Sequence, residues 1–160
     1  MEVAPMSLDI LFTDNQKKQL FENNKKSLEL NIFEPNFKPV ALLFAEKLNY
    51  KFLITQLEER RPRVAFSLSD YGNGDLEFEV LDIDQLEQLV INKGDILKST
   101  PSFEGKYNLA IYAKVADQKG QIITDDNLDD VKSLFAKLSK EERYNDPNKN
   151  VRRFRYLGIE

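Results

Sequence analysis

Period-two alternation of apolar and polar residues marks the middle of the chain. Four segments either alternate in this way or are apolar on both faces, which is typical of β-strands. The predicted strands span residues 40–45, 50–57, 63–69 and 76–81. Because only short connections separate them, and a parallel crossover needs about a dozen residues, neighbouring strands must be antiparallel. Both faces of 50–57 are largely apolar, so this strand should be central, whereas Ser67 and Ser69 predict a wetter face on the next strand.

Before the strands, the sequence predicts one helix. Thr13 and Gln16 have the spacing of a capping box, in which each side chain accepts a hydrogen bond from the main-chain amide of the other residue. The polar run at 23–26 ends this helix near Asn24. Residues 27–39 contain two prolines and are predicted to form an extended connection.

After the strands, apolar residues recur at every third or fourth position, which predicts helices. Asp82 caps the first of these helices, and Gly94 ends it. Asn108 caps the second, which ends at Gly120. Residues 107–115 also alternate as a strand would, but the helix is favoured because caps flank it at both ends.

The last part of the chain predicts another helix and a basic segment. The helix opens at Thr124 or Asp125, and residues 139–142 match a capping box that predicts a short extra turn. Residues 151–157 are strand-like and basic.

Together these elements predict the α+β class: an antiparallel β-meander of about four strands packed against three to four helices, with a C-terminal strand-like basic segment. A length of 160 residues fits one domain and is too short for two ordinary ones. We expect a single domain over 1–160, with residues 1–10 flexible and with 123–160 as a helical and basic extension packed on the same domain.

The composition is that of a globular chain, with 41% hydrophobic and 31% charged residues. The longest unbroken apolar runs, such as 40–45, are far shorter than the ~20 residues that cross a bilayer. The N-terminus has neither the basic nor the apolar region of a signal peptide. We therefore expect a cytoplasmic protein without membrane contact.

Cysteine and histidine are both absent. Without cysteine there is no disulfide, zinc–thiolate site or thiol nucleophile. Without histidine there is no imidazole metal ligand and no Ser-His or Cys-His catalysis. Carboxylate, lysine and tyrosine chemistry remain, together with oxygen-ligated Mg²⁺ or Ca²⁺. We therefore predict a non-enzymatic protein without catalytic residues, metal or cofactor.

The net charge of −4 argues against general coating of nucleic acid, which needs a basic face, but it leaves room for a local basic patch. Such a patch is formed near the C-terminus by Arg152, Arg153, Phe154, Arg155 and Tyr156. Basic and aromatic residues together suit phosphate contact and base stacking. The alternative is an edge strand whose arginines pair with acidic neighbours. The charged hairpin tip at 58–63 is predicted to be solvated.

The loop between the last two strands contains a second candidate site. Asp70, Asp75 and Glu77 could supply oxygen ligands to a divalent cation, and Gly72 and Gly74 could let the main chain approach a phosphate. The alternative is a hairpin turn, in which Asn73 and Gly74 supply the positive φ angles of a type I′ connection. The turn is favoured because the segment lacks the spacing of a twelve-residue calcium loop.

Several segments keep the spacing of a known family. They are Leu11-Phe12-Thr13, Asn23, Pro39-Val-Ala-Leu-Leu-Phe44, Phe52-Leu-Ile-Thr55, Phe66-Ser-Leu-Ser-Asp70-Tyr-Gly72-Asn-Gly74, and Leu109, Tyr112, Ala113 and Gly120. Over residues 11–122 the chain resembles the family known as domain of unknown function 2958, whose members are often encoded on plasmids, conjugative elements and phages. Family members usually carry glutamate where this chain has Gln56, and a Glu-Arg-Asp cluster where it has residues 98–100. The resemblance implies a mobile-element accessory protein without a settled activity.

The missing catalytic residue types and the resemblance together predict an accessory protein of a mobile genetic element that acts by binding a protein partner. A more specific hypothesis is inhibition of a host nuclease defence, such as a restriction or CRISPR complex. One alternative is a nucleic-acid-binding module that uses the basic segment 152–156. Another is a carboxylate- or Mg²⁺-dependent enzyme that uses Asp70 and Glu77.

Overall fold

The structure is a computed structural model that describes residues 8–32, 34–125, 129–142 and 157–158. Four strands form an antiparallel meander, namely β1 (Ala41–Ala45), β2 (Tyr50–Leu57), β3 (Val64–Asp70) and β4 (Leu76–Asp82). The predicted meander is therefore confirmed, with strand ends that differ by one residue or less. Two short strands extend it. β5 (Lys98–Ser99) pairs antiparallel with β1, and β6 (Leu157–Gly158) pairs parallel with β4, so that the strand order is β5-β1-β2-β3-β4-β6.

The described helices are α1 (Leu8–Leu11), α2 (Asp14–Leu30), α3 (Ile83–Asn92), α4 (Leu109–Lys119) and α5 (Asp129–Glu142), with a 3₁₀ turn, η1, at Glu34–Asn36. The helices α2, α3 and α4 begin where the sequence places their caps. Thr13, Asp82 and Asn108 each accept a hydrogen bond from a main-chain amide in the first turn of α2, α3 and α4. These contacts confirm the predicted caps, and α4 confirms that residues 109–115 are helical rather than a strand.

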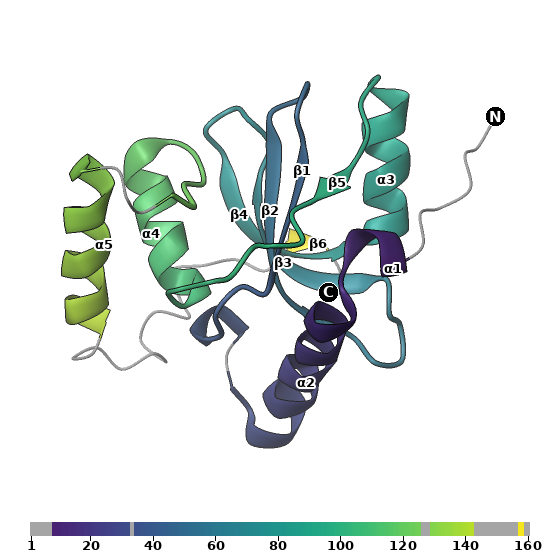
Figure 1. Cartoon of the computed structure of the whole chain (residues 1–160), viewed down its shortest axis with the longest axis horizontal. Coiled ribbons are helices and arrows are strands. Elements are labelled where there is room, and N and C mark those ends of the chain that lie inside the picture. Colours follow the sequence, from purple (N-terminus) through teal and green to yellow (C-terminus); the bar gives the residue numbers. More distant parts are fainter. Residues whose placement is uncertain (1–7, 33, 126–128, 143–156, 159–160) are drawn as a thin grey trace.

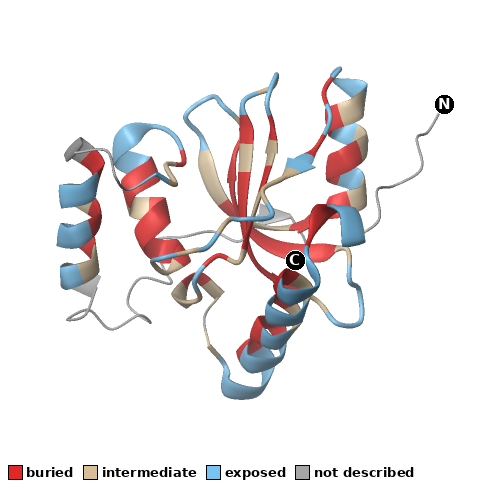
Figure 2. Cartoon of the chain, viewed as in Figure 1, coloured by how far each residue is buried: buried red, intermediate tan, exposed pale blue. Residues whose placement is uncertain are grey.

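Helices cover both faces of the sheet (Figure 1). On one face, α4 and α5 lie side by side, whereas α3 lies on the other face together with α1 and α2. The sheet is thus the middle layer between two helical layers, and the outward faces of the helices are the exposed ones (Figure 2).

Each interface between layers has its own hydrophobic core. The first core lies between the sheet and α1, α2 and α3, and it contains Phe52 and Ile54 of β2. The second lies between the sheet and α4 and α5, and it contains Leu53. Because consecutive side chains of a strand point to opposite faces, β2 contributes to both cores. Its predicted central position is confirmed.

The predicted end of α2 near Asn24 was wrong, since the helix continues to Leu30. Asn23 and Asn24 lie on its buried side, although both are polar. The side-chain amide of Asn23 donates to the Thr55 main-chain oxygen at 2.9 Å, and the Gln56 side chain donates to the Asn24 side-chain oxygen at 3.2 Å. Because they have these partners on β2, two polar residues can lie on the buried face of the helix. The local pattern wrongly predicted a helix end there, because consecutive polar residues often mark one.

Other local predictions also need correction. Ser67 and Ser69 do not form a wet face, because both residues are fully buried, their hydroxyl groups contact each other, and Ser69 also donates to Glu79. Residues 139–142 continue α5 rather than forming a separate turn. β5 was missed because a two-residue strand has no periodicity to detect.

Several predictions fall wholly or partly outside the described residues. Residues 126–128 precede α5 and are among those not described, so its start at Thr124 or Asp125 stays a prediction. α1 begins at Leu8, inside the segment predicted to be flexible, and residues 1–7 lie outside the described part.

Candidate functional site

The loop candidate between β3 and β4 has a structural role at Asp70. Its side chain is 2% exposed, and both carboxylate oxygens are occupied. One accepts from the Gly72 amide at 2.9 Å, and the other accepts from the Ile122 amide at 2.9 Å. Asp70 therefore ties the end of β3 to the chain that follows α4. A carboxylate committed to two main-chain donors is a poor candidate for holding a cation.

The loop itself is a five-residue hairpin connection over residues 71–75. The predicted type I′ turn was wrong, because the positive φ angles belong to Gly72 and Gly74 and not to Asn73. A side chain at Gly72 would place its Cβ 2.9 Å from the Asn49 main-chain oxygen, so the close contact with the β1–β2 connection requires glycine. Glu77 is half-buried on β4 opposite Ser69. Among the described residues, no cluster of three or more acidic side chains is placed to hold a metal ion.

The second predicted site, the basic segment Arg152, Arg153, Phe154, Arg155 and Tyr156, lies outside the described residues. Its contact with nucleic acid stays a prediction.

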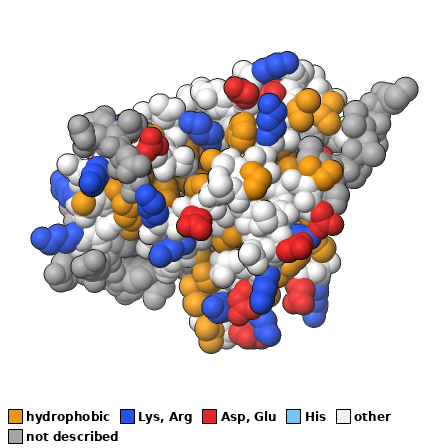
Figure 3. Space-filling view, in the orientation of Figure 1, with side chains coloured by type: hydrophobic (Ala, Val, Ile, Leu, Met, Phe, Trp, Pro, Cys, Tyr) orange, Lys and Arg blue, Asp and Glu red, His pale blue; other side chains and the backbone are white. Residues whose placement is uncertain are grey.

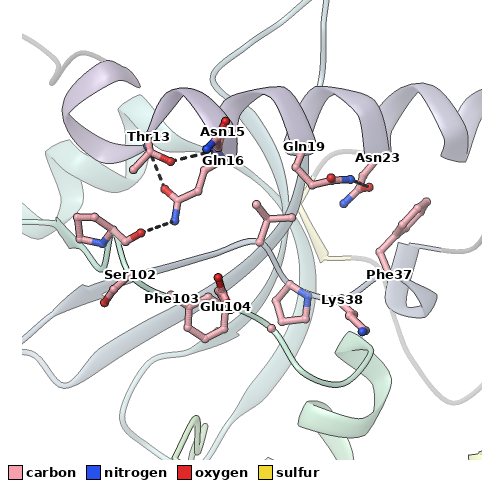
Figure 4. Close-up of a pocket in the computed structure, with 14 residues that line it drawn as sticks. Thr13, Asn15, Gln16, Gln19, Asn23, Phe37, Lys38, Ser102, Phe103 and Glu104 are labelled. Carbon is pink, nitrogen blue, oxygen red and sulfur yellow. Dashed lines mark hydrogen bonds between the residues drawn. The ribbon is translucent and has the colours of Figure 1, made fainter.

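The structure instead brings three separate segments together around an open groove of about 810 Å³ (Figure 4). One wall is a face of α2, the second is the segment 37–40 that leads into β1, and the third is the loop 101–105 after β5. The volume lies within the range of roughly 300–1,000 Å³ that is common for ligand sites. The groove is therefore large enough to hold a ligand or a segment of another protein.

The α2 wall is lined by side-chain amides and one hydroxyl. They belong to Thr13, Asn15, Gln16, Gln19 and Asn23. Gln16 completes the capping box with Thr13, and its amide nitrogen also lies 3.4 Å from the Pro101 main-chain oxygen on the third wall. Gln19 donates to the side-chain oxygen of Asn23 at 2.8 Å (Figure 4), and Asn23 in turn donates to Thr55. The buried Gln16 and Asn23 thus hold the wall in place, while Asn15 and Gln19 are exposed to the groove.

The other two walls are joined to each other by close main-chain packing. A Cβ at Gly105 would lie 2.2 Å from the Pro39 main-chain oxygen, so only glycine allows this approach. The Phe37 main-chain oxygen accepts from the Leu109 amide at 2.8 Å, which fixes the second wall to the start of α4. Phe37 and Phe103 line the groove and are half-buried. They add apolar surface to an otherwise polar site.

Sequence reasoning identified Thr13, Gln16, Asn23 and Pro39 only as local features or as parts of the resemblance. A usable signal was present, because polar residues at 16, 19 and 23 share the helix face that also carries the buried Leu20. Polar residues on the inward side of a helix need partners. The spacing of these residues does not show which segments lie opposite them, because that depends on tertiary packing.

A second polar cluster lies beside α3. The hydroxyl groups of Tyr71 and Ser69 both donate to Oε1 of Glu79, and Ser67 contacts Ser69 at 3.1 Å. Tyr71 and Glu79 line a pocket of about 560 Å³, which the apolar residues Leu81, Leu86 and Leu89 also line. Burial raises the pKa of Glu79, although the hydrogen bonds from Tyr71 and Ser69 oppose this effect. Burial and the neighbouring carboxylate also raise the pKa of Tyr71.

The raised pKa of Glu79 predicts how stability depends on pH. A carboxyl group with a higher pKa in the folded state contributes stability below its ordinary pKa and loses that contribution as the pH rises through the folded value. Glu79→Gln keeps an oxygen acceptor but cannot ionise. We therefore expect the variant to gain free energy of unfolding relative to the wild type as the pH rises from mildly acidic to neutral. Urea unfolding at several pH values measures this difference.

Glu22→Gln, on the exposed face of α2, provides the matched control for this measurement. It removes one carboxylate from the exposed surface and so shows the effect of losing a negative charge alone. Parallel profiles of Glu79→Gln and the wild type across the range would contradict the assignment.

The fold and the groove define an α+β protein with three layers, two hydrophobic cores and an amide-lined surface site. The chain belongs to the family described as Protein of unknown function (DUF2958), whose model matches residues 11–123. This match confirms the resemblance found in the sequence, and it includes all three walls of the groove. The comparison with curated proteins and the comparison with solved structures each give no match. Within the described residues, no helix has the length and apolar character that a membrane span requires.

Proposed function

We propose that the protein acts by binding a protein partner and that the groove between α2, residues 37–40 and residues 101–105 is the contact surface. The observation that carries this proposal is the convergence of the three segments on one open site of about 810 Å³. The site combines exposed amides with half-buried aromatic rings. This mixture suits the polar and apolar surface of another protein.

The charge distribution near the groove also favours a protein over a nucleic acid at this site. Lys38 and Glu104 are exposed on neighbouring walls and carry opposite charges. On the face seen in Figure 3, acidic and basic side chains are interspersed over α2. A nucleic-acid site needs an excess of basic residues, and the described residues that line this groove include one basic and one acidic side chain.

The accessory role in a mobile genetic element and the inhibition of a host nuclease defence belong to the same proposal. Their support is the family resemblance in the sequence together with a surface suited to binding. Under this hypothesis the partner in the groove is a component of a restriction or CRISPR complex. The alternative of nucleic-acid binding through residues 152–156 stays a prediction.

Site-specific photo-crosslinking in the host cell tests the proposal. A photoreactive amino acid at Ser102, an exposed residue of the groove wall, should yield a defined crosslinked product. The same amino acid at Asp117, exposed on α4 and not part of the groove, should not yield it. Mass spectrometry then identifies the partner, and a nuclease-complex subunit is the expected result. Failure to form a product at Ser102, or identical products from both positions, would contradict the proposal.

Paired amide variants supply the matched control. Asn15→Ala/Gln19→Ala removes the exposed amides of the groove and should abolish the Ser102 product. Asn92→Ala/Gln118→Ala removes two exposed amides from α3 and α4 and should leave that product unchanged. The two double variants remove the same chemical groups, so a difference between them locates the binding surface.

A further inference from the structure

We infer that the partner enters the groove as an extended polypeptide segment and that the amides of α2 recognise its main chain. This inference rests on the proposed function, because it specifies what the same groove binds. A primary amide carries both N–H donors and a carbonyl acceptor. It can therefore pair with the N–H and C=O groups of a peptide, whichever side chains the peptide carries.

Hydrogen bonds within the protein determine which way the oxygen and the nitrogen of these side-chain amides point. Because the Asn23 nitrogen donates to the Thr55 main-chain oxygen, the Asn23 side-chain oxygen must point away from β2. That oxygen accepts from the Gln19 nitrogen at 2.8 Å. The bond uses one N–H of Gln19 and leaves the Gln19 oxygen available to a donor in the groove. Gln19 is thus held in one orientation before a ligand arrives, which lowers the entropic cost of binding.

The spacing along α2 matches the repeat of an extended chain. Asn15, Gln19 and Asn23 are four residues apart, so successive side chains advance by roughly 6 Å along the helix axis. Two residues of an extended chain advance by about 6.6 Å. In a strand, every second residue presents its N–H and C=O groups to the same side. Asn15 and Gln19 are therefore placed to contact alternate residues of one extended segment that runs along the helix.

The remaining walls fit such a segment as well. Phe37 and Phe103 are half-buried in the groove and offer apolar surface to side chains that point away from α2. Lys38 and Glu104 have opposite charges, so the walls give no net preference for an acidic or a basic peptide. Recognition should therefore depend strongly on the main chain and weakly on peptide charge.

Selection from a displayed library of random twelve-residue peptides, with the full-length protein as bait, tests the inference. Enriched peptides should bind the wild type and lose about tenfold or more in affinity for Asn15→Met or Gln19→Met. Methylation of alternate main-chain nitrogens in an enriched peptide removes N–H donors and keeps every side chain. In one of the two registers this should also reduce binding by about tenfold or more.

Gln118→Met on α4 serves as the matched control and should bind the enriched peptides as the wild type does. Gln19→Met removes a hydrogen bond to Asn23 and so could alter the fold. Asn15→Met leaves that hydrogen bond in place and tests the inference independently. The inference is overturned if no peptide is enriched on the wild type over Asn15→Met, or if methylation leaves binding unchanged in both registers. If a partner still crosslinks at Ser102 in that case, the proposed function holds, and only the recognition of the peptide main chain is refuted.

Discussion

Phe135→Ala is expected to lower the free energy of unfolding by about 3–5 kcal/mol, the range for removing a fully buried aromatic side chain. Phe135 has no exposed surface. Its ring stacks on Tyr107 with centroids 4.7 Å apart and meets Tyr112 edge-on at 5.4 Å. Truncation would open a cavity between α4 and α5, where these contacts lie. Chemical denaturation followed by circular dichroism measures the loss.

Phe135 lies outside the part of the chain that the family model matches, which ends at residue 123. If α5 belongs to the same cooperative unit, the variant should unfold in one transition at lower denaturant concentration. Lys132→Ala, on the exposed side of α5, should change stability by less than about 0.5 kcal/mol. Unfolding of Phe135→Ala at the wild-type midpoint would show that α5 does not stabilise the rest of the protein.

Arg63→Ala is expected to lower the free energy of unfolding by about 3 kcal/mol because it removes the guanidinium that is paired with a buried acid. The sequence predicted a solvated hairpin tip at 58–63, and for Arg63 this was wrong. Its guanidinium contacts Asp84 and lies 2.7 Å from Oε1 of Glu87, both on α3. Glu87 is only 3% exposed. We place the cost at the low end of the range for buried pairs because the Arg63 side chain is 23% exposed. Thermal and urea unfolding measure it.

The same connection supplies a matched control. Arg61 pairs with Glu58 three residues away, and its side chain is 56% exposed, so Arg61→Ala should cost no more than about 1 kcal/mol. Adding Glu87→Gln to Arg63→Ala removes the buried negative charge and should recover part of the loss. Equal effects of Arg61→Ala and Arg63→Ala would mean that the pair with α3 contributes nothing to stability.

Local patterns predicted the elements of this fold because their causes are local. The caps at Thr13, Asp82 and Asn108 each join residues three positions apart, and such contacts are readable from spacing alone. The strands of the meander could be located because period-two alternation and short connections determine their pairing. The predictions failed where a polar residue has its partner far away in sequence. Asn23 contacts Thr55, Arg63 contacts Glu87, and Asp70 contacts Ile122.

The candidate sites differ in the same way. The sequence singled out Asp70 and Glu77 because acids and glycines are close together there, yet Asp70 is occupied by two main-chain amides. The groove was not predicted because its walls come from residues 13–23, 37–40 and 101–105. Each wall is unremarkable in isolation, and only their proximity creates a site.

The sequence by itself determined that cysteine and histidine are absent, where most helices and strands lie, and to which family the chain is similar. These follow from residue types and from contacts between residues a few positions apart. The tertiary structure alone decided which polar residues are buried, which carboxylates are already bonded, and which segments enclose the groove. These depend on the packing of α2, α3 and the loop after β5 against the sheet, and such packing joins residues that no periodicity relates.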